Sequence, residues 1–171
     1  MTISVLTAVT AMSMFAFTMV YAGITDLTSY KIRNDLMLFF LLAYAALAPF
    51  SGLTVSEIGW SAAVATGVLL VVFSFFAFGW IGGGDAKLAA VTSLWFGAGQ
   101  TPEYLVYTAL FGGAFTMAML KFRGLPLPAF LLNKPWIVRL HSRDSGIPYG
   151  VAMALAGLVV FPQSRWMASV F

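Results

Sequence analysis

Long apolar runs separated by short polar segments constrain the fold of this chain more than any other feature. A membrane-spanning helix needs about 20 apolar residues, and six runs reach or approach that length. Only 9% of the residues are charged, whereas a soluble domain usually carries about a quarter. We therefore expect residues 1–171 to form one all-α transmembrane domain with about six spans. The runs are Ile3–Thr25, Leu36–Leu53, Ile58–Trp80, Ala86–Ala98, Tyr104–Leu120 and Ile147–Phe161.

The distribution of Lys and Arg predicts the orientation of these spans, because cytoplasmic loops are enriched in both residues. With both chain ends outside, eight of the nine basic residues fall in cytoplasmic loops and only Arg165 falls on the outer side. We therefore expect the N-terminus and the C-terminus to lie outside. The cytoplasmic set is Lys31, Arg33, Lys87, Lys121, Arg123, Lys134, Arg139 and Arg143.

The last polar segment and the first apolar run each have a distinctive pattern of basic residues. Pro128–Arg143 mixes large apolar side chains with basic ones, a pattern typical of an amphipathic stretch that lies in the membrane interface. We expect it to contact lipid in the last cytoplasmic loop, with Trp136 at headgroup level. The first run has no Lys or Arg before Lys31, so it lacks the basic region of a signal peptide and is expected to be a retained span.

The composition excludes several classes of catalytic and metal site. The chain contains no Cys and one His, so cysteine nucleophiles, Ser-His triads and thiolate or histidine metal centres all lack parts. No metal or cofactor is expected. A basic stripe with interleaved aromatic residues is also missing, so nucleic acid is not an expected partner. The remaining catalytic chemistry must come mainly from carboxylates or from Lys, Ser, Thr and Tyr.

Asp26 and Asp85 are the acidic residues that the topology makes informative. Asp26 stands at the end of the first run and Asp85 at the start of the fourth, with two complete runs between them. Because that number is even, both carboxylates face the same side of the membrane, which the basic residues indicate is the cytoplasm. Taken singly, each Asp is better explained as a helix cap or a solvated helix end than as a catalytic group.

Three consecutive glycines, Gly82, Gly83 and Gly84, precede Asp85. Such a stretch can adopt positive φ and lets another chain approach closely, which a peptidase needs because its substrate lies extended beside the catalytic groups. Two carboxylates held together share one proton. The ionised member can then take a proton from water while the protonated member polarises the scissile carbonyl.

These residues resemble the motifs of the prepilin peptidases, a family of membrane aspartic proteases. The family's Gly-x-Gly-Asp motif matches Gly82-Gly83-Gly84-Asp85, and Lys87 fits its usual continuation. The family's first Asp is followed by Ile-Pro-Asn, and here Asp26 is followed by Ile32-Arg33-Asn34, with arginine in place of proline. Ile147-Pro148-Tyr149-Gly150 resembles the Pro-Tyr-Gly segment that opens the family's last span.

The resemblance extends from about Ile3 to Phe161 and implies an activity. Members remove the short basic leader of type IV prepilin or pseudopilin precursors during pilus biogenesis, in the bacterial cytoplasmic membrane and on its cytoplasmic side. The cut falls after a glycine and before the hydrophobic segment. The resemblance implies Asp26 and Asp85 as the catalytic pair, with supporting or substrate-binding roles for Gly82, Gly83, Gly84, Lys87, Asn34, Pro148 and Gly150.

Longer members of the family carry a cytoplasmic region with paired cysteines and also N-methylate the new terminus. This chain has no cysteines and resembles the short form that serves tight-adherence (Flp-type) pili, so methyltransferase activity is not expected. Alternatives remain open: a small proton- or ion-coupled transporter that uses the same aspartates, or a non-catalytic assembly subunit. Asn34 either caps the second helix or holds the loop that follows Asp26.

Overall fold

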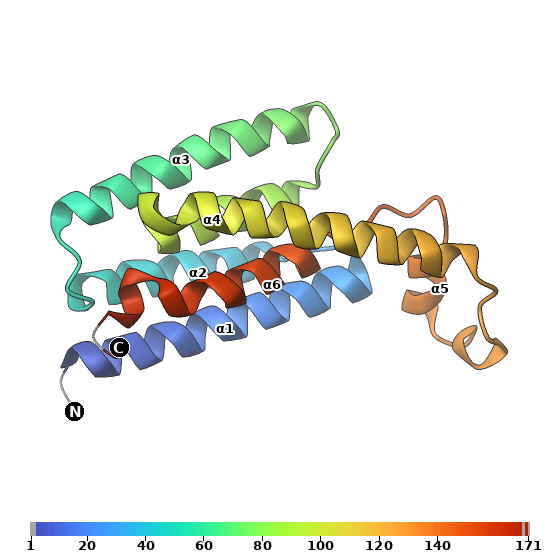
Figure 1. Cartoon of the computed structure of the whole chain (residues 1–171), viewed down its shortest axis with the longest axis horizontal. Coiled ribbons are helices and arrows are strands. Elements are labelled where there is room, and N and C mark those ends of the chain that lie inside the picture. Colours follow the sequence, from blue (N-terminus) through green and yellow to red (C-terminus); the bar gives the residue numbers. More distant parts are fainter. Residues whose placement is uncertain (1–2, 169, 171) are drawn as a thin grey trace.

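The structure is a computed structural model that describes residues 3–168 and residue 170, and these residues form helices and no β-strand. Figure 1 shows the helices as a bundle elongated along their common direction. The all-α expectation is confirmed. The elements are α1 (Ile3–Ser29), α2 (Asn34–Leu47), α3 (Val55–Ala77), α4 (Gly83–Gly124), α5 (Pro135–His141) and α6 (Gly150–Val160), with 3-10 turns at Ala48–Phe50, Ala129–Leu131, Phe161–Gln163 and Arg165–Met167.

Three of these helices, α1, α3 and α4, are long and apolar enough to cross a membrane. The apolar helix that begins with α2 and the one that begins with α6 are shorter. The chain is therefore a membrane protein by the length and composition of its helices. Both termini lie at one end of the bundle, whereas the α1–α2 and α3–α4 connections lie at the opposite end (Figure 1).

The helix α4 reverses direction at Gly97, where the backbone leaves the helical region (φ 60°, ψ −162°). The Thr101 hydroxyl donates to the carbonyl of Ser93 at 3.3 Å, and the rings of Phe96 and Tyr104 lie 5.3 Å apart. Each pair is eight residues apart, which is about 12 Å in a straight helix. The two halves of α4 therefore form a hairpin, in agreement with the separate fourth and fifth apolar runs of the sequence.

The reversal depends on glycine, so we expect Gly97→Ala to destabilise the fold. Its combination of φ and ψ is essentially restricted to glycine, and a Cβ there would lie 2.8 Å from Oγ of Ser61. We expect the free energy of unfolding to fall by about 1–3 kcal/mol, measured as a lower melting temperature in detergent. Gly99→Ala is the matched control, since no neighbour lies within 4 Å of the added Cβ. Equal melting temperatures for the two variants would contradict this account.

An aromatic cluster forms the centre of the bundle. Phe15 of α1 stacks on Phe161 with ring centroids 4.1 Å apart, and Phe40 of α2 stacks on Trp95 of α4 at 4.9 Å. The Trp95 indole N–H donates to the carbonyl of Phe40 at 3.2 Å, which satisfies its polar group inside the core. By contrast, α3 buries only Ser61 and exposes most of its large apolar side chains, as a helix facing lipid does.

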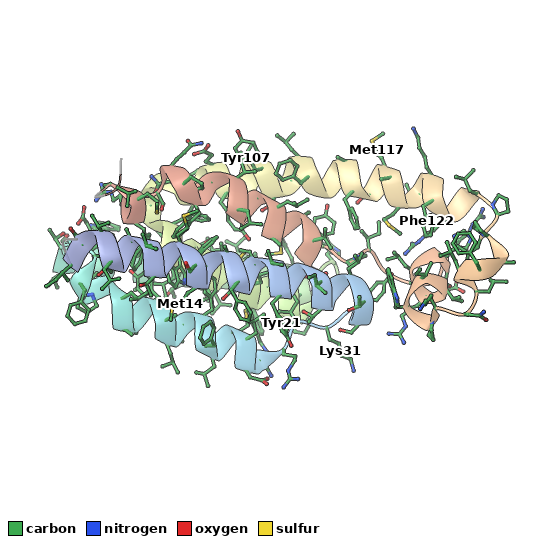
Figure 2. The ribbon with its side chains drawn as sticks, turned by 90° about the horizontal axis from the view of Figure 1, so that it is seen from below. Met14, Tyr21, Lys31, Tyr107, Met117 and Phe122 are labelled. Carbon is green, nitrogen blue, oxygen red and sulfur yellow. The ribbon has the colours of Figure 1, made fainter. Side chains whose placement is uncertain are left out.

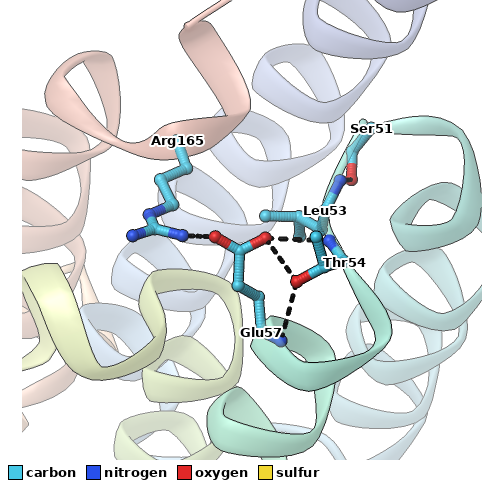
Figure 3. Close-up of polar contacts among 5 residues, drawn as sticks. All are labelled: Ser51, Leu53, Thr54, Glu57 and Arg165. Atoms are coloured by element: carbon cyan, nitrogen blue, oxygen red, sulfur yellow. Dashed lines mark hydrogen bonds and ion pairs between the residues drawn. The ribbon is translucent and has the colours of Figure 1, made fainter.

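The end of the bundle that carries the termini is held by polar contacts around Glu57 (Figure 3). Thr54 and Glu57 form a capping box at the start of α3, in which each side chain accepts a hydrogen bond from the other residue's backbone N–H. The carboxylate of Glu57 also forms an ion pair with Arg165, close to the C-terminus. These charged residues therefore lie at the opposite end of the bundle from Asp26 and Asp85.

Some helix boundaries differ from those expected. The first helix continues past Asp26 to Ser29, and the backbone N–H of Tyr30 donates to the carbonyl of Asp26 at 2.9 Å. The last helix begins at Gly150 and not at Ile147, since Pro148 disfavours helical backbone in the residue before it. The segment Pro128–Arg143 contains α5 and a 3-10 turn, and its location at a membrane surface stays a prediction.

Candidate active site

A cavity of about 400 Å³ opens at the end of the bundle opposite the termini. It lies between the end of α1, the connection to α2 and the beginning of α4. Asp26 and Asp85 both line it, so the structure brings together the two acids that the sequence singled out. The lining residues are Asp26, Tyr30, Lys31, Ile32, Arg33, Asn34, Asp35, Gly82, Gly83, Gly84 and Asp85.

Asp26 lies in the last turn of α1 and is 5% exposed. Its Oδ2 accepts a hydrogen bond of 2.7 Å from the backbone N–H of Gly150, the first residue of α6. The N-terminus of a helix carries partial positive charge and unpaired N–H groups. The contact with α6 therefore compensates the burial of a carboxylate at this position.

Gly150 approaches Asp26 so closely that it has no room for a side chain. A Cβ at this position would lie 2.8 Å from Oδ2, 2.9 Å from Cβ and 3.0 Å from Cγ of Asp26. The sequence indicated Gly150 as a supporting residue by resemblance alone. The structure supplies a physical reason, because only glycine lets the backbone amide reach the carboxylate.

Asp85 lies in the first turn of α4 and is partly buried. Gly82 is the N-cap residue of this helix, and a Cβ there would lie 3.0 Å from Oδ2 of Asp85. Asp85 lines the same cavity as Asp26, so the two acidic side chains border one shared space. Asp85 thus lies at the N-terminal end of α4, and the Asp26 carboxylate contacts the N-terminal end of α6, where negative charge is favoured.

The three glycines before Asp85 differ from the expectation in one respect. None of them adopts positive φ in this structure; the glycines with positive φ are Gly52, Gly79 and Gly97. Gly83 lies against the ring of Phe76, 3.2 Å from a would-be Cβ, and Gly84 lies at the same distance from Cβ of Ile32. Here the missing side chains let the start of α4 approach α3 and the first loop closely.

Lys87 and Asn34 meet across the rim of the cavity. The Lys87 ammonium donates to Oδ1 of Asn34 at 2.9 Å, which joins the N-terminal part of α4 to the first residue of α2. Asn34 does not cap α2, because the N-cap residue is Arg33 and no side chain makes a capping hydrogen bond there. Of the two roles considered for Asn34, holding the loop after Asp26 is the one that this contact fits.

Pro148 and Tyr149 anchor the segment that carries Gly150. Pro148 is fully buried. The ring of Tyr149 lies against Gly112 in the second half of α4, where an added Cβ would be 2.5 to 2.8 Å from three of its atoms. The Pro-Tyr-Gly segment therefore fixes the start of α6 between α4 and α1.

The family model of the type IV leader peptidases matches residues 13–117, which is more than half of the chain and includes both Asp26 and Asp85. The chain belongs to the type IV leader peptidase family. It is accordingly a leader-peptidase-like protease. No curated protein and no solved structure is significantly similar to it.

Arg33 occupies the position where this peptidase family typically has proline, yet its backbone is one that proline adopts. It has φ −72° and ψ 143°, close to the φ that a pyrrolidine ring imposes. Its side chain forms an ion pair with Asp35, whose carboxylate raises the pKa of the Arg33 guanidinium through this hydrogen bond and its charge. The turn between α1 and α2 therefore keeps a proline-like backbone without the proline.

We expect Arg33→Pro to be tolerated by this peptidase. The substitution removes an ion pair between two exposed side chains, which is worth about 0–1 kcal/mol, and proline at a compatible φ contributes about 0.4–1 kcal/mol. The melting temperature and the rate of leader cleavage should therefore stay near those of the unsubstituted protein. A strongly destabilised or inactive variant would show that the Arg33 side chain has a role of its own.

Two residues around the site carried no signal in the sequence. Tyr30, four residues after Asp26, has φ 56° and is the one non-glycine residue with positive φ in the described part of the chain. Its hydroxyl is buried without a hydrogen-bond partner. In the sequence Arg123 is one of several cations outside the apolar runs, whereas in the structure its guanidinium donates to two backbone carbonyls. Within residues 3–168 and 170, no three His, Asp or Glu side chains gather into a metal site.

Proposed function

We propose that this chain is a membrane aspartic endopeptidase that removes the leader of Flp-like type IV prepilins. One observation carries the proposal: Asp26 and Asp85, from helices far apart in the sequence, line the same cavity at one end of an apolar bundle. Membership of the type IV leader peptidase family supports the reaction class. The aspartic mechanism rests on the two acids, and the Flp-like substrate rests on the resemblance of this cysteine-free sequence to the family members that serve tight-adherence pili.

The mechanism follows from how two nearby carboxyl groups share charge. Two carboxyl groups in one cavity cannot both ionise easily, so the pair of Asp26 and Asp85 holds one proton between them. The ionised carboxylate removes a proton from an attacking water, and the protonated one donates to the scissile carbonyl oxygen. The N-terminal ends of α6 and α4 stabilise the negative charge that remains on the pair.

We propose a topology of six spans in which the two halves of α4 count separately and the shorter α2 and α6 also cross. This arrangement places both termini outside and the cavity at the cytoplasmic face of a bacterial inner membrane. Lys31 and Lys87 lie at that end beside the cavity, whereas Arg165 lies at the other. The excess of cations around the cavity supports this orientation.

The placement of the acids favours a peptidase over a proton-coupled transporter. Transporters keep their ionisable groups near the middle of the membrane, usually between broken helices. Here Asp26 lies in the last turn of α1 and Asp85 in the first turn of α4. A site at the end of the bundle is accessible to a peptide from one side, which cleavage of a leader requires.

The direct test is to reconstitute the purified protein in liposomes with an Flp-type prepilin and to follow the mass of the pilin. We expect loss of the leader, with the new N-terminus directly after the glycine that precedes the hydrophobic segment. The same liposomes should show no aspartate-dependent proton flux. Proton flux without any cleavage would refute the proposal and support the transporter.

A further inference from the structure

Arg123 connects three segments near the candidate site. It lies in the last turn of α4, in the part of the helix that extends past the rest of the bundle, where Figure 2 shows its neighbour Phe122. Its Nε donates to the carbonyl of Leu140 at 2.9 Å, and its Nη2 donates to the carbonyl of Gly146 at 2.7 Å. One guanidinium therefore joins α4, the end of α5 and the connection to α6.

The connection that Arg123 holds leads directly to Asp26. Gly146 precedes by four residues Gly150, whose N–H bonds to the Asp26 carboxylate. Between them, the ring of Tyr149 lies against Gly112 of α4. Gly112 and Arg123 are eleven residues apart, about 16 Å along the helix. The helix α4 thus holds this short connection at two separated points.

The geometry of these contacts requires an arginine. A guanidinium presents several N–H donors in a rigid plane and can bond two carbonyls at once, whereas an ammonium is a compact point charge. The carbonyl of Leu140 lies in the last turn of α5, where no helical N–H follows to pair with it. The positive charge alone does not account for these bonds, because both acceptors are neutral backbone oxygens.

We propose that Arg123 is a positioning residue for the pair of Asp26 and Asp85. It fixes the connection between α5 and α6, so that the Gly150 amide stays on the Asp26 carboxylate and holds it in the orientation that the shared proton requires. The expected effect of Arg123 on leader cleavage rests on the proposed function, whereas its expected effect on hydrogen–deuterium exchange does not. If Arg123 has this role, the loop between α4 and α6 helps to shape the site and does more than contact lipid.

The test compares Arg123→Lys and Arg123→Gln with the control Lys121→Gln. Lys121 carries the same charge two residues away and makes no hydrogen bond or ion pair in the described structure. We expect both Arg123 variants to lower kcat about 10- to 100-fold, because the Asp26 carboxylate is misplaced, with KM changed less than about 2-fold. Lysine should not rescue, and Lys121→Gln should cleave like the unsubstituted protein.

A double-mutant cycle with Gly150→Ala tests whether Arg123 acts through the Gly150 amide. If it does, adding Arg123→Gln to Gly150→Ala should cause little further loss, since coupled changes are not additive. Rescue by lysine would overturn the proposal, because charge would then suffice. If the loss of kcat in the double variant equalled the product of the losses in the two single variants, the proposal would also be overturned, because Arg123 would then act independently of the Gly150 amide.

Hydrogen–deuterium exchange provides a readout that does not depend on cleavage. In Arg123→Lys, amides in residues 146–151 should exchange at least about 10-fold faster, since local opening controls their exchange, while α1 residues 8–20 keep their protection. Unchanged exchange in that segment would refute the positioning role even if no substrate were cleaved. Faster exchange together with no cleavage by the unsubstituted protein would refute the proposed function. It would still establish that Arg123 fixes the connection between α5 and α6.

Discussion

Replacing Asp26 or Asp85 with asparagine is expected to abolish leader cleavage while the protein still inserts and folds. Asparagine keeps the size of the side chain but cannot share a proton with the remaining acid, so neither the water nor the carbonyl is activated. Loss of general acid–base catalysis costs about 10²- to 10⁴-fold in rate. The measurement is the initial rate of leader removal in liposomes, with melting temperature as the check on folding.

The matched control for these substitutions is Asp144→Asn. Asp144 lies in the loop before α6, outside the cavity, and makes no hydrogen bond or ion pair in the described structure. It should cleave at the unsubstituted rate. Wild-type cleavage by either Asp26→Asn or Asp85→Asn would exclude the proposed pair.

Gly150→Ala is expected to lower cleavage about 100-fold, because a displacement of about 1 Å in a catalytic group has an effect of that size. The added Cβ would lie within 3.0 Å of three atoms of the Asp26 side chain, so the carboxylate or the start of α6 must move. The backbone N–H is retained, so the loss reports displacement and not removal of the donor. The measurement is kcat for leader removal, compared with Gly113→Ala.

Gly113 is a suitable control because no atom lies within 4 Å of a Cβ added there, although it lies beside Gly112 in the same helix. Gly113→Ala should retain its kcat and its melting temperature. If Gly150→Ala cleaved as fast as this control, the Asp26–Gly150 contact would have no part in catalysis.

The positions of the two acids could be predicted from the sequence because they depend on counting. Two apolar runs separate Asp26 from Asp85, and an even number places both on the same side of any membrane. The family model confirmed the recognition of a type IV leader peptidase. The separation of the fourth and fifth runs also has a structural counterpart, the reversal at Gly97.

The contacts that shape the site could not be predicted from the sequence. The hydrogen bond from Gly150 to Asp26 joins residues 124 positions apart, and the neighbouring Tyr149 lies against Gly112 in a third helix. Local patterns do not encode such distances. Arg123 was indistinguishable from other loop cations, since what sets it apart is the pair of carbonyls that the fold brings to it.

Where the prediction was wrong, local chemistry gives the reason. The glycines before Asp85 were considered able to adopt positive φ, but they lie in ordinary helical or extended backbone and allow close approach to Phe76 and Ile32. Asn34 was considered as a helix cap, yet its side chain accepts from Lys87. Both outcomes depend on side chains that arrive from distant segments.

Labelling of single cysteines from each face of the membrane tests the central claim most directly, because the chain has no Cys of its own. A membrane-impermeant maleimide is applied to Asp26→Cys, Asp85→Cys and Glu57→Cys in sealed vesicles of both orientations. We expect positions 26 and 85 to react only from the cytoplasmic face and position 57 only from the outer face. Reaction of positions 26 and 85 from opposite faces would contradict a shared active site.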